Sequence, residues 1–165
     1  MKLKKLLSIL LISASLMTVS TSAFADNGST NIEIVPQVVG VGDTRATATD
    51  LLNGSDYNLF LESSTDEDWF RWTNNTGAPK LIYSLAYNKG SENVIVQGAI
   101  VQYRPNSEAG MIFANPSGKN NPSWPSAFDL LYIPEGATVF FRVKASEFVK
   151  LESYRYQFFV VDIHN

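Results

Sequence analysis

The chain has 165 residues, no cysteine, and 16 acidic residues against 13 basic ones. Without cysteine it cannot form the disulfide framework of small exported folds, so a packed hydrophobic core has to provide its stability. Three of the basic residues stand at the extreme N-terminus, and the rest of the chain carries a net charge of −6. This acidic balance disfavours nucleic acids and anionic membrane surfaces as partners, because both require a basic face.

The N-terminus is typical of an export signal. Three lysines within residues 2–5 precede an apolar stretch at 6–17, and Ala23-Phe24-Ala25 provides the small residues that signal peptidase reads. The apolar stretch is shorter than the roughly 20 residues that a transmembrane helix needs. We therefore expect residues 1–25 to be cleaved after Ala25 and the remaining 140 residues to be secreted without a membrane anchor.

The mature chain begins with a polar segment, residues 26–42, which contains a possible edge strand at 32–39 interrupted by Pro36. Short apolar runs separated by Gly, Pro, Asn and Ser then follow one another to the C-terminus. They predict strands at 57–62, 68–73, 80–87, 93–104, 111–114, 127–133, 138–145 and 154–163. Helical periodicity is never sustained. Residues 43–165 are therefore expected to form one all-β domain, a two-sheet antiparallel β-sandwich of the jelly-roll kind.

The closing strand, 154–163, is apolar on both faces, with Phe158 on one side and Phe159 on the other. In an amphipathic sheet only one face of a strand is apolar. This pattern predicts a strand that is covered on both faces.

Alternation also predicts a binding patch on the outer side of two strands. Four side chains lie opposite the expected core positions of their strands: Trp69, Arg71, Phe140 and Arg142. If strands 68–73 and 138–145 are neighbours, these side chains form an exposed aromatic and arginine surface, the composition enriched in binding hot spots. The alternative is that a loop such as 115–125 covers Trp69, or that Trp69 belongs to the core.

Trp124 lies in the longest predicted loop, between two prolines. A tryptophan in this position either plugs the end of the sandwich or offers a ligand a stacking surface. The sequence leaves both interpretations open.

An acidic cluster, Asp66-Glu67-Asp68, precedes the aromatic strand. On an extended chain Asp66 and Asp68 point the same way, so together with loop carbonyls they are a candidate calcium site. The alternative is that one aspartate binds the turn backbone while the others are solvated. The pair could also act as a glycosidase acid and nucleophile, which requires two carboxyl groups in a cleft.

Other catalytic chemistry has little support in the sequence. His164 is the only histidine, and there is no cysteine. The sequence therefore strongly disfavours a zinc site with histidine ligands and a Ser–His or Cys–His nucleophile, and leaves only serine-only or carboxylate-only catalysis open. We predict that the protein is not an enzyme.

The segment Ser64–Thr73, closed by Gly77, resembles the signature of the bacterial pre-peptidase C-terminal domain family, an Asp-x-Asp-Trp-aromatic-x-aromatic strand followed by a glycine turn. Three further segments are similar to the family's opening segment, penultimate strand and closing strand, in that order: 43–51, 134–143 and 156–160. Residues 98–125 depart from the family pattern.

The resemblance implies a jelly-roll-like sandwich that serves as an accessory module of secreted peptidases and other hydrolases. Relatives in bacterial collagenases bind collagen and calcium. No catalytic domain is recognisable beside it here. We therefore expect a secreted, non-catalytic module that binds an extracellular protein, a polysaccharide or a separate secreted peptidase, with Ca²⁺ as its candidate cofactor. The alternatives are a structural or self-associating matrix protein and, less favoured, a small carboxylate-dependent hydrolase.

Overall fold

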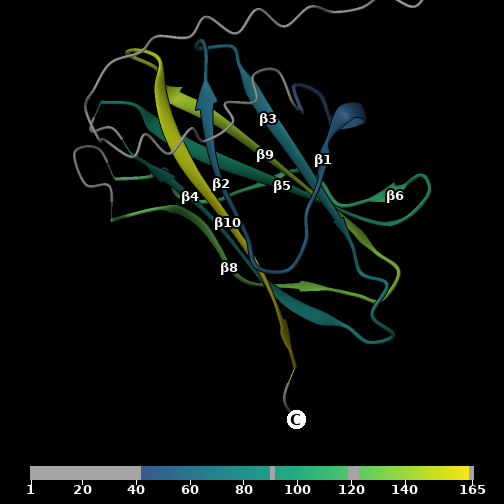
Figure 1. The fold of residues 1–165 in the computed structure, drawn as a ribbon. Coiled ribbons are helices and arrows are strands. Elements are labelled where there is room, and N and C mark those ends of the chain that lie inside the picture. Colours follow the sequence, from purple (N-terminus) through teal and green to yellow (C-terminus); the bar gives the residue numbers. More distant parts are fainter. Residues whose placement is uncertain (1–41, 90–91, 119–122, 164–165) are drawn as a thin grey trace, which may run out of the picture. The chain divides into compact units, whose positions relative to one another are not determined.

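The computed structural model describes residues 42–89, 92–118 and 123–163 (Figure 1), all within the compact unit Pro36–Asn165. The expected signal peptide and the possible strand at 32–39 lie outside the described residues. The described residues form ten strands and one short 3₁₀ helix, η1 (Arg45–Thr47). No helix in this part of the chain is long and apolar enough to cross a membrane.

The strands form two sheets. In sheet A the order is β1 (Thr49–Asp50), β3 (Glu67–Thr73), β9 (Thr138–Glu147), β5 (Val94–Arg104) and β6 (Ser107–Glu108), and β7 (Ile112–Phe113) also pairs with β5. In sheet B it is β2 (Ser55–Leu61), β10 (Glu152–Asp162), β4 (Lys80–Asn88) and β8 (Ser126–Ile133). From β2 to β10 the long strands alternate between the two sheets. The predicted β-sandwich is confirmed, with one parallel pair, β1 and β3, among antiparallel ones.

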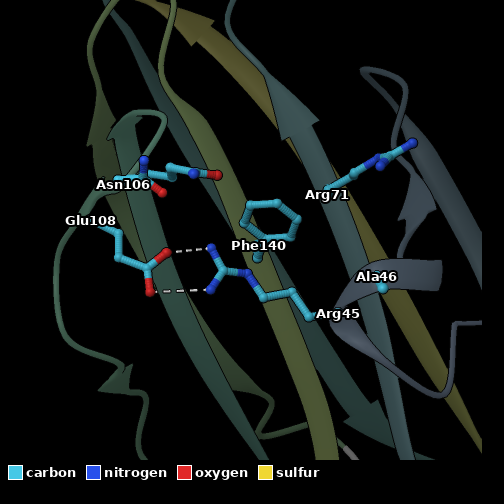
Figure 2. Close-up of a pocket in the computed structure, with 7 residues that line it drawn as sticks. Arg45, Ala46, Arg71, Asn106, Glu108 and Phe140 are labelled. Atoms are coloured by element: carbon cyan, nitrogen blue, oxygen red, sulfur yellow. Dashed lines mark hydrogen bonds and ion pairs between the residues drawn. The ribbon is translucent and has the colours of Figure 1, made fainter.

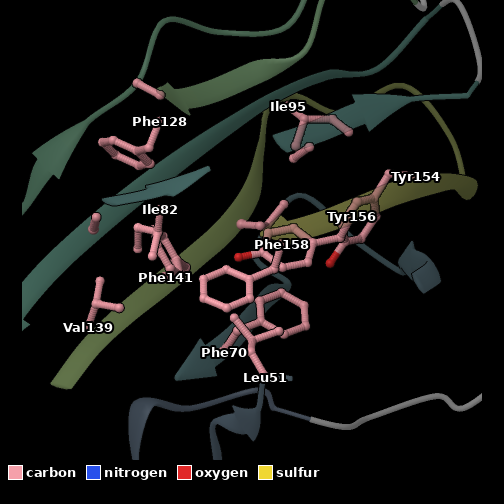
Figure 3. Packing of buried hydrophobic residues seen from close by; sticks show 14 of the residues in the cluster. Leu51, Phe70, Ile82, Ile95, Phe128, Val139, Phe141, Tyr154, Tyr156 and Phe158 are labelled. Atoms are coloured by element: carbon pink, nitrogen blue, oxygen red, sulfur yellow. The ribbon is translucent and has the colours of Figure 1, made fainter. Parts of the chain in front are cut away.

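The core lies between the two sheets, where side chains alternate inward from each strand (Figure 3). Phe141 of β9 and Phe158 of β10 are fully buried and meet edge to face, with ring centroids 6.1 Å apart. Phe70 of β3 stacks on Tyr156 of β10 at 4.2 Å. Because these pairs join sheet A to sheet B, aromatic packing fixes how the sheets lie against each other.

Eight of the ten strands lie within two residues of their predicted bounds. The two unpredicted strands, β1 and β6, have two residues each, and their partners lie elsewhere in the sheet. Thr49 pairs with Phe70, for example. Such short strands have too few residues to show alternation, so their own sequence gives no signal.

The closing strand differs from its expectation. β10 lies between β2 and β4 inside sheet B, and its inward residues, such as Phe158, are buried as predicted. Its second face is not covered, since Phe159 is 38% exposed. The second row of apolar residues therefore belongs to the molecular surface.

Candidate functional site

Three carboxylates converge at the start of β3. One oxygen from each of Asp43, Asp66 and Asp68 lies within 4.8 Å of the others. Asp68 is buried in the strand, Asp66 is half-buried in the preceding turn, and Asp43 is exposed just before η1. The sequence predicted the pair of Asp66 and Asp68. It did not predict Asp43, because that contact joins segments distant in the chain.

Gly42 is what allows Asp43 to reach the pair. The carbonyl of Gly42 accepts a hydrogen bond from the Trp69 backbone amide at 2.6 Å. Gly42 has a φ of +88°, and a Cβ atom there would lie 2.6 Å from the Trp69 carbonyl oxygen. Only glycine permits both the backbone conformation and this close approach.

The two predicted aspartates have different surroundings. The backbone amide of Glu62 donates to Asp66 Oδ2 at 2.7 Å and so closes the turn. This contact agrees with the interpretation in which one aspartate binds the turn backbone. That interpretation also expected the other aspartates to be solvated, but Asp68 is buried. Its Oδ2 accepts a hydrogen bond of 2.5 Å from the Tyr154 hydroxyl of β10.

Burial raises the pKa of Asp68 to about 7. The hydrogen bond from Tyr154 acts against this shift, whereas the nearby Asp66 and Asp43 carboxylates add to it. Burial also raises the pKa of Tyr154 well above its usual value, which keeps the hydroxyl protonated as a donor. A cation between the three carboxylates would relieve their repulsion, and oxygen-only donors suit a hard ion such as Ca²⁺.

The glycosidase interpretation requires the two carboxyl groups to face a cleft. Two grooves of the described structure, one over Phe140 and one beside Trp124, are lined by other residues. Asp68 lies beneath the surface against Tyr154. Neither of these two grooves therefore contains the acid pair.

The four side chains of the predicted patch do lie on one face of sheet A. β3 and β9 are neighbours, with Trp69 opposite Arg142 and Arg71 opposite Phe140. Trp69 is only 8% exposed, however, so it does not offer the exposed ring that a binding patch requires. Trp69 packs into a small second cluster on this face with Ala48, Ile100, Met111 and Phe140. Of the 115–125 loop, the described residues 115–118 and 123–125 are not part of that cluster.

Both arginines of the patch are already paired. The Arg142 guanidinium lies between the rings of Trp69 and Phe113, at 5.8 and 5.7 Å from their centroids, and donates to Glu67 at 3.1 Å. Arg71 forms two parallel hydrogen bonds with Asp50. Trp69 and Arg142 are therefore packed on the outer face of sheet A and are not available to bind a ligand.

Trp124 is 69% exposed. Its ring lies beside a groove of about 530 Å³ lined also by Asn115, Pro116, Gly118, Pro125 and Ala127. Of the two interpretations of Trp124, its exposure favours the stacking surface.

A second group of surface aromatics lies on the outer face of sheet B. Across β4 and β10, Tyr83 stands opposite Phe159 and Tyr87 opposite Arg155. On the adjacent strand β8, Tyr132 is 53% exposed. We call this surface the tyrosine face, and it consists of Leu81, Tyr83, Leu85, Tyr87, Tyr132, Phe159 and Val161. The sequence analysis missed it because it expected β10 to be covered on both sides.

Comparison with known proteins gives little beyond this geometry. No family model matches the chain, and no curated protein matches it. Among solved structures it is similar to the pre-peptidase C-terminal domain of a collagenase from Bacillus anthracis, with a TM-score of 0.45 and 12% identity. That match covers 67% of this chain and 93% of the other. The similarity is low on both measures, so the proposals below rest on the surfaces themselves.

Proposed function

We propose that the protein is a secreted, non-catalytic binding module and that its tyrosine face binds an extracellular protein. The observation that carries this proposal is the row of aromatic side chains across β10, β4 and β8, next to Arg155. Tyrosine and arginine are enriched at protein interfaces, where they dominate the binding energy. A small-molecule site would instead be concave, whereas this surface is the open face of a sheet.

The alternative of a self-associating matrix protein is less well supported at β8, one of the two edges of sheet B. β8 is an edge strand of sheet B, and an exposed regular edge would favour pairing between copies. Its pairing with β4 shifts register between Ile82 and Ser84, and Leu130 has a φ of 56°. An irregular edge of this kind resists the addition of another strand.

Calcium is part of this proposal as a structural ion. Asp43, Asp66 and Asp68 would hold it, and it would tie the segment before η1 to the start of β3. The fit rests on three oxygen donors that converge, one of them desolvated. The ion would stiffen the module without taking part in any reaction.

The tyrosine face can be tested by retention of the protein on insoluble polymers. Fibrillar collagen serves as the protein probe, and chitin and cellulose serve as polysaccharide probes. We expect collagen to retain the protein, and the double variant Tyr83→Ala, Tyr132→Ala to bind at least about tenfold more weakly, because it removes two interface anchors.

Phe113→Ala is the matched control, since Phe113 is an aromatic residue on sheet A with 60% exposure. It should leave retention unchanged. Retention by the polysaccharides alone that is lost in the double variant would identify a glycan as the partner of this face. Equal loss in the control, or no loss in the double variant, would refute the role of the tyrosine face.

A further inference from the structure

An open groove of about 680 Å³ lies on the outer face of sheet A, on the side of the sandwich away from the tyrosine face. Phe140 lies at its centre, between Glu108 of β6 and Arg71 of β3 (Figure 2). Arg45 of η1 extends across the Phe140 ring, with its guanidinium carbon 4.3 Å from the ring centroid. The volume is within the range of small-ligand sites, about 300–1,000 Å³.

The guanidinium groups of the two arginines that line the groove are held in fixed positions, that of Arg45 over Phe140 and that of Arg71 against Asp50 of β1. Arg45 donates two parallel hydrogen bonds to Glu108, at 3.1 and 2.5 Å, and thereby links η1 to the β5–β6 hairpin. Arg71 forms the same bidentate arrangement with Asp50, at 2.6 and 3.1 Å. Exposed ion pairs of this kind contribute little to stability. Their main effect is to orient the donors that remain.

The groove keeps a large unused hydrogen-bonding capacity. A guanidinium has five N–H donors, and each of these arginines uses two of them on its carboxylate. In the part of the chain that the structure describes, the side-chain amides of Gln102 and Asn106 make no hydrogen bond. Each amide offers both donors and an acceptor.

We infer that this groove binds a neutral saccharide. Each of the two arginines is neutralised by a carboxylate, Arg45 by Glu108 in the groove and Arg71 by Asp50 beside it, so the site has no strong preference for an anion or a cation. Its oriented donors and acceptors can bind the hydroxyl groups of a sugar ring. The flat Arg45 guanidinium, which lies over the Phe140 ring, and the part of that ring that stays exposed can contact the C–H face of a sugar ring. Because the groove is open, it can accept an internal segment of a sugar chain.

A protein partner fits this groove less well than the tyrosine face. Protein anchors are large aromatic or arginine side chains that enter fully desolvated apolar pockets. Here the apolar lining residues are Phe140 and the small Ala46, and charged and amide groups surround them. The saccharide site lies on the opposite sheet from the proposed protein surface, so either proposal can fail without the other.

The test is a titration of the isotope-labelled full-length protein with neutral hexasaccharides of glucose, N-acetylglucosamine, mannose and xylose, followed by amide chemical shifts. We expect at least one to shift the amides of Gln102, Asn106 and Phe140 at concentrations up to about 10 mM. Because the ligand is uncharged, its affinity should be unchanged by added salt. A hexamer of galacturonic acid is the anionic comparison.

The variant Gln102→Ala with Asn106→Gly should weaken binding at least about tenfold. Glycine is chosen at position 106 because Asn106 has a φ of 64°, which alanine would strain. Tyr132→Ala, on the tyrosine face, is the control and should bind the sugar normally. Three outcomes would overturn the inference. The four neutral sugars could all leave the amides of the groove unshifted, or they could shift only amides of sheet B. The third outcome is salt-sensitive binding of the anionic hexamer alone.

Discussion

Replacing Gln97 by alanine should lower the free energy of unfolding by about 3–5 kcal/mol, the largest stability loss we expect from any single change outside the aromatic core. Gln97 is fully buried on the inner face of β5. Its truncation leaves a cavity and removes a partner from several buried polar groups. Urea denaturation of the variant and the natural protein measures the difference.

The size of this effect follows from the contacts that Gln97 makes across the sandwich. Its Oε1 accepts the Ser84 hydroxyl at 2.7 Å, and its Nε2 donates to the carbonyls of Ser84 and Ser126. The Ser84 hydroxyl also contacts the Tyr156 hydroxyl at 2.8 Å. Gln97 belongs to sheet A, whereas Ser84, Ser126 and Tyr156 belong to sheet B. The network therefore sets the position of one sheet on the other, and loss of one member leaves the rest unsatisfied.

Two further variants separate packing from hydrogen bonding. Gln97→Met keeps most of the side-chain volume and removes the hydrogen bonds, so it should retain a loss of about 2 kcal/mol. Gln157→Ala, a glutamine on the outer face of β10, should change stability by less than about 0.5 kcal/mol. A Gln97→Met variant as stable as the natural protein would show that the network contributes nothing beyond its volume.

The inward-facing residues of the strands were predictable because every second side chain of a strand points into the core. Val139, Phe141 and Val143 alternate with polar or half-buried residues, and the structure buries all three. Gln97 also follows the inward register of β5, but its chemistry alone predicts a surface residue. Only its partners on the other sheet make its burial favourable, and no local pattern encodes them.

The sites were less predictable because they depend on contacts between distant segments. The spacing of Asp66 and Asp68 was visible in the sequence, whereas the third carboxylate, Asp43, is brought there by the approach of Gly42 to Trp69. Trp69 was expected on the outer face and lies there. Ala48, which follows η1, and Met111 contribute to its burial, and the alternation within 68–73 reveals neither contact.

Calcium should raise the thermal midpoint of the protein at pH 8, by about 8 °C when free Ca²⁺ is about 100 times its Kd. The reason is the ionisation of Asp68, whose pKa is about 7 in the folded protein against an ordinary value of 3.8. Between these two values the folded state binds a proton that the unfolded state releases. The contribution of Asp68 to stability therefore falls as the pH rises from about 4 to 7. Above pH 7 the buried carboxylate is charged and uncompensated, and a cation can take over the role of the proton.

The variant Asp68→Asn separates these effects, because an amide keeps an oxygen for the Tyr154 hydroxyl and carries no charge. It should be more stable than the natural protein at pH 8 without calcium, and its midpoint should not respond to calcium or to a chelator. Asp129→Asn, an exposed aspartate on β8, is the control and should keep the full response. If the natural protein melts at the same temperature in calcium and in chelator at pH 8, the three carboxylates do not hold the ion. A midpoint that still falls between pH 5 and 8 would then show that Asp68 is a buried acid without a metal, because proton binding by the folded state alone produces that slope.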